Sequence, residues 1–238
     1  MLTVRIDATE VKRWMAAANN QLPYATMLAI NRTAKMVKDE IREEMVRVFN
    51  RPTPYTLNSL MTEMATKRNL QGQVWLRDVW GGGGGVPGVN YIGPAIFGEG
   101  RYAKAHELAL RMAGILRNNM MVVPGKDAPL DQYGNISGEL IKQMMSGLSI
   151  GREAGYMSNI TAASRQRNKG RAVYFTMGNP PIGIFTRQGG VVKCFEKFVK
   201  APSYQPRLDF FGLGQRVIDE HLQNETIIAI EEALRTAR

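Results

Sequence analysis

Histidine and cysteine side chains carry much of enzymatic nucleophilic, acid–base and metal chemistry, and this chain has very few of them. Its two histidines, His106 and His221, lie 115 positions apart. Neither has a second histidine, a cysteine or a carboxylate at the spacing of a zinc motif such as HExxH or a CxxC pair. We therefore interpret both histidines as surface or helix-face residues.

The single cysteine, Cys194, lies in the β-prone run VVKCFEKFV. A thiol there is expected to be a small buried core residue rather than a nucleophile with His106 as its base. Cys194 also has no partner for an intrachain disulfide, which fits a reducing compartment. The chain is therefore expected to fold without a disulfide staple.

Carboxylates would have to carry the chemistry of a nuclease or cell-wall hydrolase, and the candidates are Asp127, Asp131 and Glu139. Their spacing does not differ from that of turn formers and helix caps. The sequence accordingly predicts a non-enzymatic protein with no catalytic residue, no metal and no cofactor. A virion-associated hydrolase stays as a second alternative.

Glycine loops can cradle phosphates, and nine glycines lie between positions 81 and 100. The run GGGGGVPG is not followed by GK[ST], and GEGRYAK lacks the third glycine of a dinucleotide fingerprint. We interpret the window as a surface loop that becomes ordered against a partner. The loop residues are Gly81, Gly82, Gly83, Gly84 and Gly85.

Basic residues are concentrated in one stretch of the chain. The whole sequence has 31 Lys and Arg against 21 Asp and Glu, a net charge of +10, while residues 161–207 alone have nine basic residues and one acidic residue. Such a block is typical of a surface for a polyanion or an acidic partner, although a solvated segment beside the acidic C-terminal helix is the alternative. The candidate interaction residues are Arg165, Arg167, Lys169 and Arg171.

The elements that would position these residues follow from hydrophobic periodicity. Residues 2–6 alternate apolar and polar side chains, which predicts a strand, and a short helix is expected over 9–18. A long helix is predicted over 24–49, with Pro23 suited to its first turn. Further helices are expected over 101–119, 139–148 and 213–236, and strands over 73–77 and in an antiparallel meander spanning 172–199.

This order of elements predicts an α+β fold, in which an antiparallel sheet packs against the long N-terminal helix and a C-terminal amphipathic helix completes the structure. Residues 1–80 are expected to form the strand and long-helix part of the core. Residues 81–160 are expected to form a glycine-rich and helical insertion. Residues 161–238, the basic meander and last helix, are expected to complete the same core.

The long helix contains LAINRTAKMVKDEIREEM, which resembles the A-x-N-R-x-A helix of the bacteriophage minor tail protein Z, or tail completion, family. The matching residues are Ala29, Asn31, Arg32 and Ala34. The section FEKFVKAPSYQPRLDF, followed by the last helix, is similar to the closing part of that family. The resemblance covers residues 1–78 and 171–238, and the middle of the chain departs from the shorter members.

The resemblance implies a structural protein of the virion at the head–tail junction or the head-proximal end of the tail. Its partners would be copies of itself in a homo-oligomeric ring, neighbouring connector or tail proteins, and DNA in the channel. It would act in tail completion and virion assembly, in the host cytoplasm and then in the particle, without a membrane or a small-molecule substrate. A sequence-independent DNA-binding protein that uses residues 161–207 is the first alternative.

Overall fold

The protein was analysed as a computed structural model, which describes residues 9–77, 86–150 and 174–236. The chain forms two compact units. Unit 1 consists of the residues up to Ile96 together with those from Pro206 onward, and unit 2 is the segment Phe97–Gln205. Unit 2 is therefore inserted into the sequence of unit 1.

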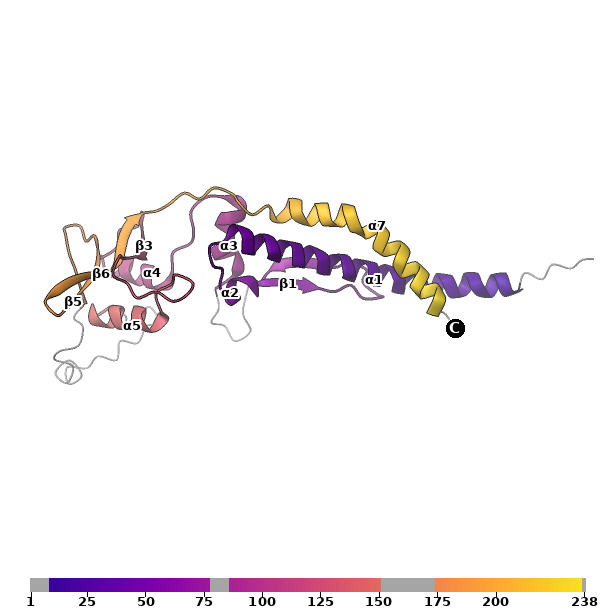
Figure 1. Ribbon diagram of the computed structural model, residues 1–238, viewed down its shortest axis with the longest axis horizontal. Coiled ribbons are helices and arrows are strands. Elements are labelled where there is room, and N and C mark those ends of the chain that lie inside the picture. The colour runs from indigo at the N-terminus through magenta and orange to yellow at the C-terminus, as the bar shows by residue number, and fades with distance from the viewer. Residues whose placement is uncertain (1–8, 78–85, 151–173, 237–238) are drawn as a thin grey trace, which may run out of the picture. The chain divides into compact units, whose positions relative to one another are not determined.

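Two long helices dominate unit 1 and run side by side along much of their length (Figure 1). These are α1, Thr9–Val48, and α7, Phe210–Thr236. A hairpin of β1, Leu60–Glu63, and β2, Gln73–Leu76, packs on α1, with Leu60 opposite Leu76. Two shorter helices, α2 (Pro54–Leu57) and α3 (Gly88–Phe97), precede and follow this hairpin.

Two clusters of buried side chains hold unit 1 together. The larger one joins Val37, Ile41 and Met45 of α1 to Leu213 and Val217 of α7, and it extends to Leu60 of β1 and Ile92 of α3. The smaller one consists of alanines, Ala25 and Ala29 on α1 against Ala229 and Ala233 on α7. Side chains this small let the backbones of two helices approach closely.

The first helix is continuous where the sequence predicted two. Pro23 lies inside α1, although a proline removes one backbone hydrogen bond and costs roughly 3 kcal/mol in a helix interior. Alanine-rich runs lie on both sides of it, MAAA at positions 15–18 and ATMLA at positions 25–29, and alanine is the best helix former. The predicted break between residues 18 and 24 was therefore wrong.

The described part of unit 2 contains a four-stranded antiparallel sheet and two helices. The strand order is β3-β6-β5-β4, in which β3 is Met120–Pro124, β4 is Tyr174–Thr176, β5 is Gly183–Gln188 and β6 is Val191–Lys200. The helices are α4, Ala105–Met112, and α5, Gly138–Gly147. The β4-β5-β6 meander and the helix near residues 139–148 were predicted correctly.

One predicted helix of unit 2 is much shorter than expected. The interval 101–119 forms helix only over α4, because the chain turns at Gly114, where φ is +70°, and the amide groups of Ile115 and Leu116 return to the carbonyl oxygen of Leu110. A helix over 101–119 would place Leu108, Met112, Ile115 and Leu116 on one apolar side, but Leu108 is 48% and Met112 69% exposed, while Leu116 is buried. The buried face of α4 carries instead His106, Glu107, Ala109 and Leu110.

The fold class is α+β, as the sequence predicted, while the division of the chain differs from the prediction. The meander does not share a core with the long helix, because β4, β5 and β6 belong to unit 2 and only the residues from Pro206 onward return to unit 1. The glycine-rich window 81–100 also contains α3, whose Ile92 and Ala95 enter the core of unit 1. No helix in the described part of the chain is long and apolar enough to cross a membrane.

Candidate functional site

The four motif residues of α1 lie within six positions, and Asn31 makes the most specific contact among them. Its side-chain Nδ2 donates a hydrogen bond to the carbonyl oxygen of Ala65 at 3.1 Å, and its Oδ1 accepts one from the amide of Ala65 at 2.7 Å. Ala65 follows β1 in the chain. The Asn31 side chain thus pairs with both the amide and the carbonyl group of Ala65, as the backbone of a neighbouring strand would.

Arg32 connects α1 to α7 on the adjoining face of the helix. Its Nη2 donates to Oε2 of Glu232 at 2.7 Å, and its Nη1 lies 3.7 Å from Oε2 of Glu225. The hydrogen bond to Glu232 raises the pKa of Arg32, and the same contact lowers the pKa of Glu232. Because water reaches both Arg32 and Glu232, this pair orients the two helices more than it stabilises them.

The two alanines of the motif permit close packing on either side. Ala29 is buried in the alanine cluster with α7. Ala34 lies against the chain just before β2, where a Cβ atom on Gly72 would sit 3.6 Å from the Ala34 Cβ. The A-x-N-R-x-A motif therefore joins α1 to α7 and to the hairpin within unit 1, and each matching residue has a structural role there.

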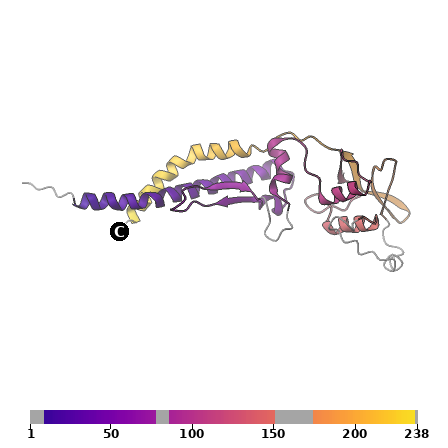
Figure 2. The same cartoon turned by 180° about the vertical axis from the view of Figure 1, so that it is seen from behind.

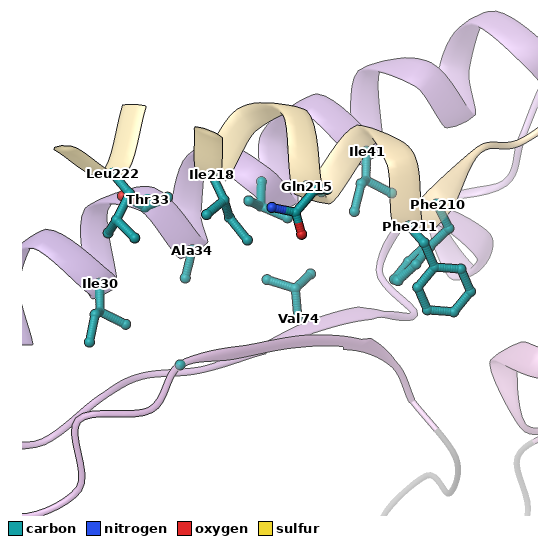
Figure 3. Close-up of a pocket in the computed structure, with 13 residues that line it drawn as sticks. Ile30, Thr33, Ala34, Ile41, Val74, Phe210, Phe211, Gln215, Ile218 and Leu222 are labelled. Atoms are coloured by element: carbon teal, nitrogen blue, oxygen red, sulfur yellow. The ribbon is translucent and has the colours of Figure 1, made fainter. Parts of the chain in front are cut away.

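A groove of about 340 Å³ opens beside this motif, between α1, α7 and β2 (Figure 3). None of the residues that line it is charged. Phe211 and Ile218, on the α7 side, are 65% and 37% exposed, so part of the apolar wall faces solvent. The hydroxyl of Thr33, on the α1 side, is buried and has no hydrogen-bond partner among the described residues.

Unit 2 contains a buried carboxylate that is fully paired. Glu107 of α4 accepts two hydrogen bonds from Arg101, at 2.6 and 2.8 Å, and one each from the backbone amides of Lys104 and Val122, both at 2.7 Å. Burial acts to raise the pKa of Glu107, but these hydrogen bonds outweigh it and lower the pKa to about 2. Glu107 thus fixes the start of α4 against β3.

A second buried pair in unit 2 is less well satisfied. Nε2 of His106 lies 3.4 Å from Oε1 of Glu196, with side chains 6% and 2% exposed, and neither His106 Nε2 nor Glu196 Oε2 has a hydrogen-bond partner among the described residues. Burial and the nearby Lys104 charge lower the pKa of His106 to about 4, and burial raises the pKa of Glu196 to about 7. Both histidines were interpreted as surface or helix-face residues: His106 lies on the buried face of α4, whereas His221 is exposed.

The three carboxylates considered for hydrolytic chemistry each have a local structural contact. Asp127 accepts a hydrogen bond from the amide of Cys194 at 2.9 Å, and Asp131 accepts two from the amides of its own turn. Glu139 lies in the first turn of α5. Cys194 is only partly buried, between core and surface, because its side chain lies on the outer face of the sheet opposite Phe185.

That outer face of the sheet in unit 2 carries aromatic and basic side chains. Phe175 and Phe185 lie opposite one another on β4 and β5, stacked with ring centroids 6.3 Å apart. Arg187 and Lys197, on the same face, are exposed. Tyr174 points inward and is buried, while Phe175 points outward.

Two groups of predicted interaction residues lie outside the described residues. They are the cations Arg165, Arg167, Lys169 and Arg171, and the glycines Gly81–Gly85. The site that the structure does reveal, the groove beside Ala34, was missed in the sequence. The one hint of this groove in the sequence is the pair of adjacent phenylalanines at positions 210 and 211. These two residues are not needed for the apolar stripe of the predicted C-terminal helix.

Comparison of the chain with protein-family models, with curated proteins and with solved structures finds no match. The likeness to the minor tail protein Z family therefore stays a prediction, based on the motif of α1 and on the closing section of the chain.

Proposed function

We propose that this chain is a non-enzymatic structural protein of a bacteriophage virion, at the head–tail junction or the head-proximal end of the tail. It acts in tail completion or connector assembly through contacts between subunits arranged in a ring. The proposal rests on the resemblance of the α1 motif. The observation that supports it best is that all four motif residues hold a two-helix scaffold with an open apolar groove.

The contacts of the polar residues agree with a structural role. Asp127 binds the backbone of β6, Asp131 closes its own turn and Glu139 lies in the first turn of α5. The buried pair of His106 and Glu196 lies within the packed layer between α4 and the sheet. Catalysis needs reactive groups that a substrate can reach. The groove is instead lined by uncharged and mostly apolar side chains, with Thr33 and Gln215 as its polar residues, and such a lining suits packing against protein.

A stop codon early in this reading frame tests the proposal in a particle-producing culture. We expect filled heads and separate tails that fail to join, seen by electron microscopy, and infectivity restored when the protein is supplied from a plasmid. Joined, infectious particles in the absence of the protein would contradict the proposal.

DNA binding is a second candidate, and the outer face of the sheet in unit 2 favours it. The stacked pair Phe175 and Phe185 lies beside the exposed cations Arg187 and Lys197. Glu196, the acidic residue of β6, is buried on the opposite face. Phe175 and Phe185 are half-buried, and aromatic side chains beside exposed basic ones on one sheet face are typical of surfaces that bind single-stranded nucleic acid.

A salt titration of DNA binding distinguishes a DNA-binding protein from one that has a structural role alone. If the sheet face binds nucleic acid, affinity for a fluorescent oligonucleotide falls steeply as salt rises, because phosphate contacts release counterions. The double variant R187Q/K197Q should then bind more weakly and with a shallower salt dependence. Absence of binding at low salt would remove this candidate.

A further inference from the structure

The groove of unit 1 lies beside the open edge of an unusually small sheet. Within the β1–β2 hairpin, the groove wall includes Val74 of β2 and Gly72 just before it, and it includes no residue of β1. Among the described strands β2 pairs only with β1, which leaves its second edge without a strand partner. A strand edge without a partner presents backbone N–H and C=O groups in a row, so this edge can accept a third strand.

The size and character of the groove suit a short apolar strand. Along α1 it extends from Ile30 to Ile41, eleven residues or about 16 Å of helix. A strand of five residues covers a similar length, at about 3.3 Å per residue. A strand beside β2 would place alternate side chains over Ile30, Ala34 and Ile218. Since no lining residue is charged, those side chains should be apolar.

One segment of the sequence has the alternating apolar pattern of such a strand and is not paired with any strand in the described part of the structure. In residues 2–6, Leu2, Val4 and Ile6 alternate with Thr3 and Arg5, which predicts a strand with one apolar face. These residues lie outside the described part of the chain and precede α1. The first turns of α1 project past the end of α7 in both views (Figures 1 and 2).

The segment cannot reach the groove of its own subunit. Ile30 lies 21 residues beyond Thr9 in α1, which is about 32 Å along the helix. Leu2 lies seven residues before Thr9, so even a fully extended chain carries it at most about 25 Å from Thr9. Any occupancy of the groove by this segment therefore requires a second copy of the chain.

We propose that residues Leu2–Ile6 of one subunit add as a third strand to the free edge of β2 in a neighbouring copy and cover its groove. Leu2, Val4 and Ile6 face the groove, while Thr3 and Arg5 face solvent. The contact pairs two different surfaces of the same chain, so it propagates from subunit to subunit, and it gives a ring when the rotation between neighbours closes. The inference thereby rests on the ring-forming role proposed above and names its contact.

The oligomeric state of the full chain tests the apolar face of the segment. We compare the wild type with L2D/V4D/I6D by analytical ultracentrifugation, and T3D/R5D serves as a control with the same change of −3 in charge. We expect the wild type and the control to assemble and the apolar-face variant to sediment as a monomer. Equal assembly of all three proteins would overturn the inference and leave the ring proposal intact, whereas a monomeric wild type would overturn both.

A mixed cross-link tests the position of the segment directly. One chain carries V4C and the other I218C, both with C194A and with tags of different mass. We expect a disulfide that joins the two tagged chains on mild oxidation of the mixture, and its loss when the groove chain also carries A34W, which fills the groove. A control pair with T3C in place of V4C should cross-link far less. Equal yields for V4C and T3C, or a yield unaffected by A34W, would contradict the proposed seating of the strand.

Discussion

At the scale of single residues, polar side chains in the interior decide how the elements of each unit are held. Asn31 binds the backbone of Ala65 with two hydrogen bonds, and Glu107 accepts four hydrogen bonds at the start of α4. These residues have all their main polar atoms paired. The pair of His106 and Glu196 is buried with unpaired atoms and is therefore the place where protonation matters most.

Asn31→Ala should destabilise the protein by about 1–2 kcal/mol, because it removes both hydrogen bonds to Ala65 and leaves that backbone poorly paired. The free energy of unfolding from denaturant titrations measures the effect. Asn224→Ala, at an exposed position of α7, is the control and should change stability by less than about 0.5 kcal/mol. Equal effects of the two substitutions would contradict the role of Asn31.

The buried pair predicts opposite pH dependences for its two single variants. Glu196 has a folded pKa of about 7, above its usual 4.5, so the wild-type carboxylate costs stability as pH rises from about 4.5 to 7. His106 has a folded pKa of about 4, below its usual 6.5, so it costs stability as pH falls from about 6.5 to 4. The two effects offset each other between about pH 4.5 and 6.5 in the wild type.

Glu196→Gln should therefore gain stability relative to the wild type as pH rises through that window, and His106→Gln should gain as pH falls. The charges that face the pair come from Lys104, Arg101 and Glu107 and are retained in both variants. Unfolding free energies measured from pH 4.5 to 7 give the two differences. Curves that stay parallel to the wild type would show that the pair does not titrate with folding.

At the scale of elements, small residues let the backbones of neighbouring helices and strands approach closely, and these approaches determine how the elements pack. Ala29 and Ala229 let α1 and α7 meet closely. In unit 2, the chain after β3 runs against β6, where the amide of Gly125 donates to the carbonyl oxygen of Phe195 at 2.8 Å. A Cβ atom on Gly125 would collide with the carbonyl group of Cys194. Such contacts tolerate no larger side chain without a shift of the backbone.

Gly125→Ala should cost about 1–3 kcal/mol, because the new methyl group meets main-chain atoms of β6 that cannot rotate away. Gly138→Ala is the matched control, since its Cβ would meet nothing within 4 Å at the start of α5. That substitution should leave stability unchanged or raise it by up to about 1 kcal/mol. Thermal unfolding of both variants checks the contrast, and a similar loss for both would contradict it.

At the scale of the whole molecule, one continuous segment is inserted into another folded unit. Unit 2 leaves unit 1 after Ile96 and returns before Pro206, and each unit has a buried core of its own. The excess of basic residues at 161–207 belongs mostly to unit 2, while the acidic residues from 208 onward belong to unit 1. Arg32 with Glu225 and Glu232 shows that α7 uses part of its acidic charge within unit 1.

Reversal of charge at Arg165, Arg167, Lys169 and Arg171 together should abolish particle assembly or DNA retention while the isolated subunit stays folded. The physical reason is repulsion where an acidic partner or DNA was attracted. Particle yield and infectivity measure the first effect, and circular dichroism of the purified subunit measures the second. The control reverses four exposed cations, for the same change of −8 in charge, at Lys35, Arg68, Lys142 and Arg216. Normal infectivity of the first variant would contradict the prediction.

The amino-acid sequence by itself determined those features that depend on neighbouring residues. The apolar stripe of α1 from Met27 to Val48 and the turn glycines of the β5–β6 hairpin predicted elements that the structure contains. The α+β class followed from their order. Local periodicity and turn chemistry act over a few residues and are therefore readable without the fold.

Only the tertiary structure decided which of these elements share a core. Nothing in the sequence marks His106 as a buried residue, and it is buried because α4 packs the face that carries it against β6. The strands β1 and β3 carried weak local signals and exist because β2 and β6 pair with them. The groove beside Ala34 joins residues up to 192 positions apart, from Ile30 to Leu222. Long-range packing of this kind depends on shape and burial, which hydrophobic patterns in one segment do not encode.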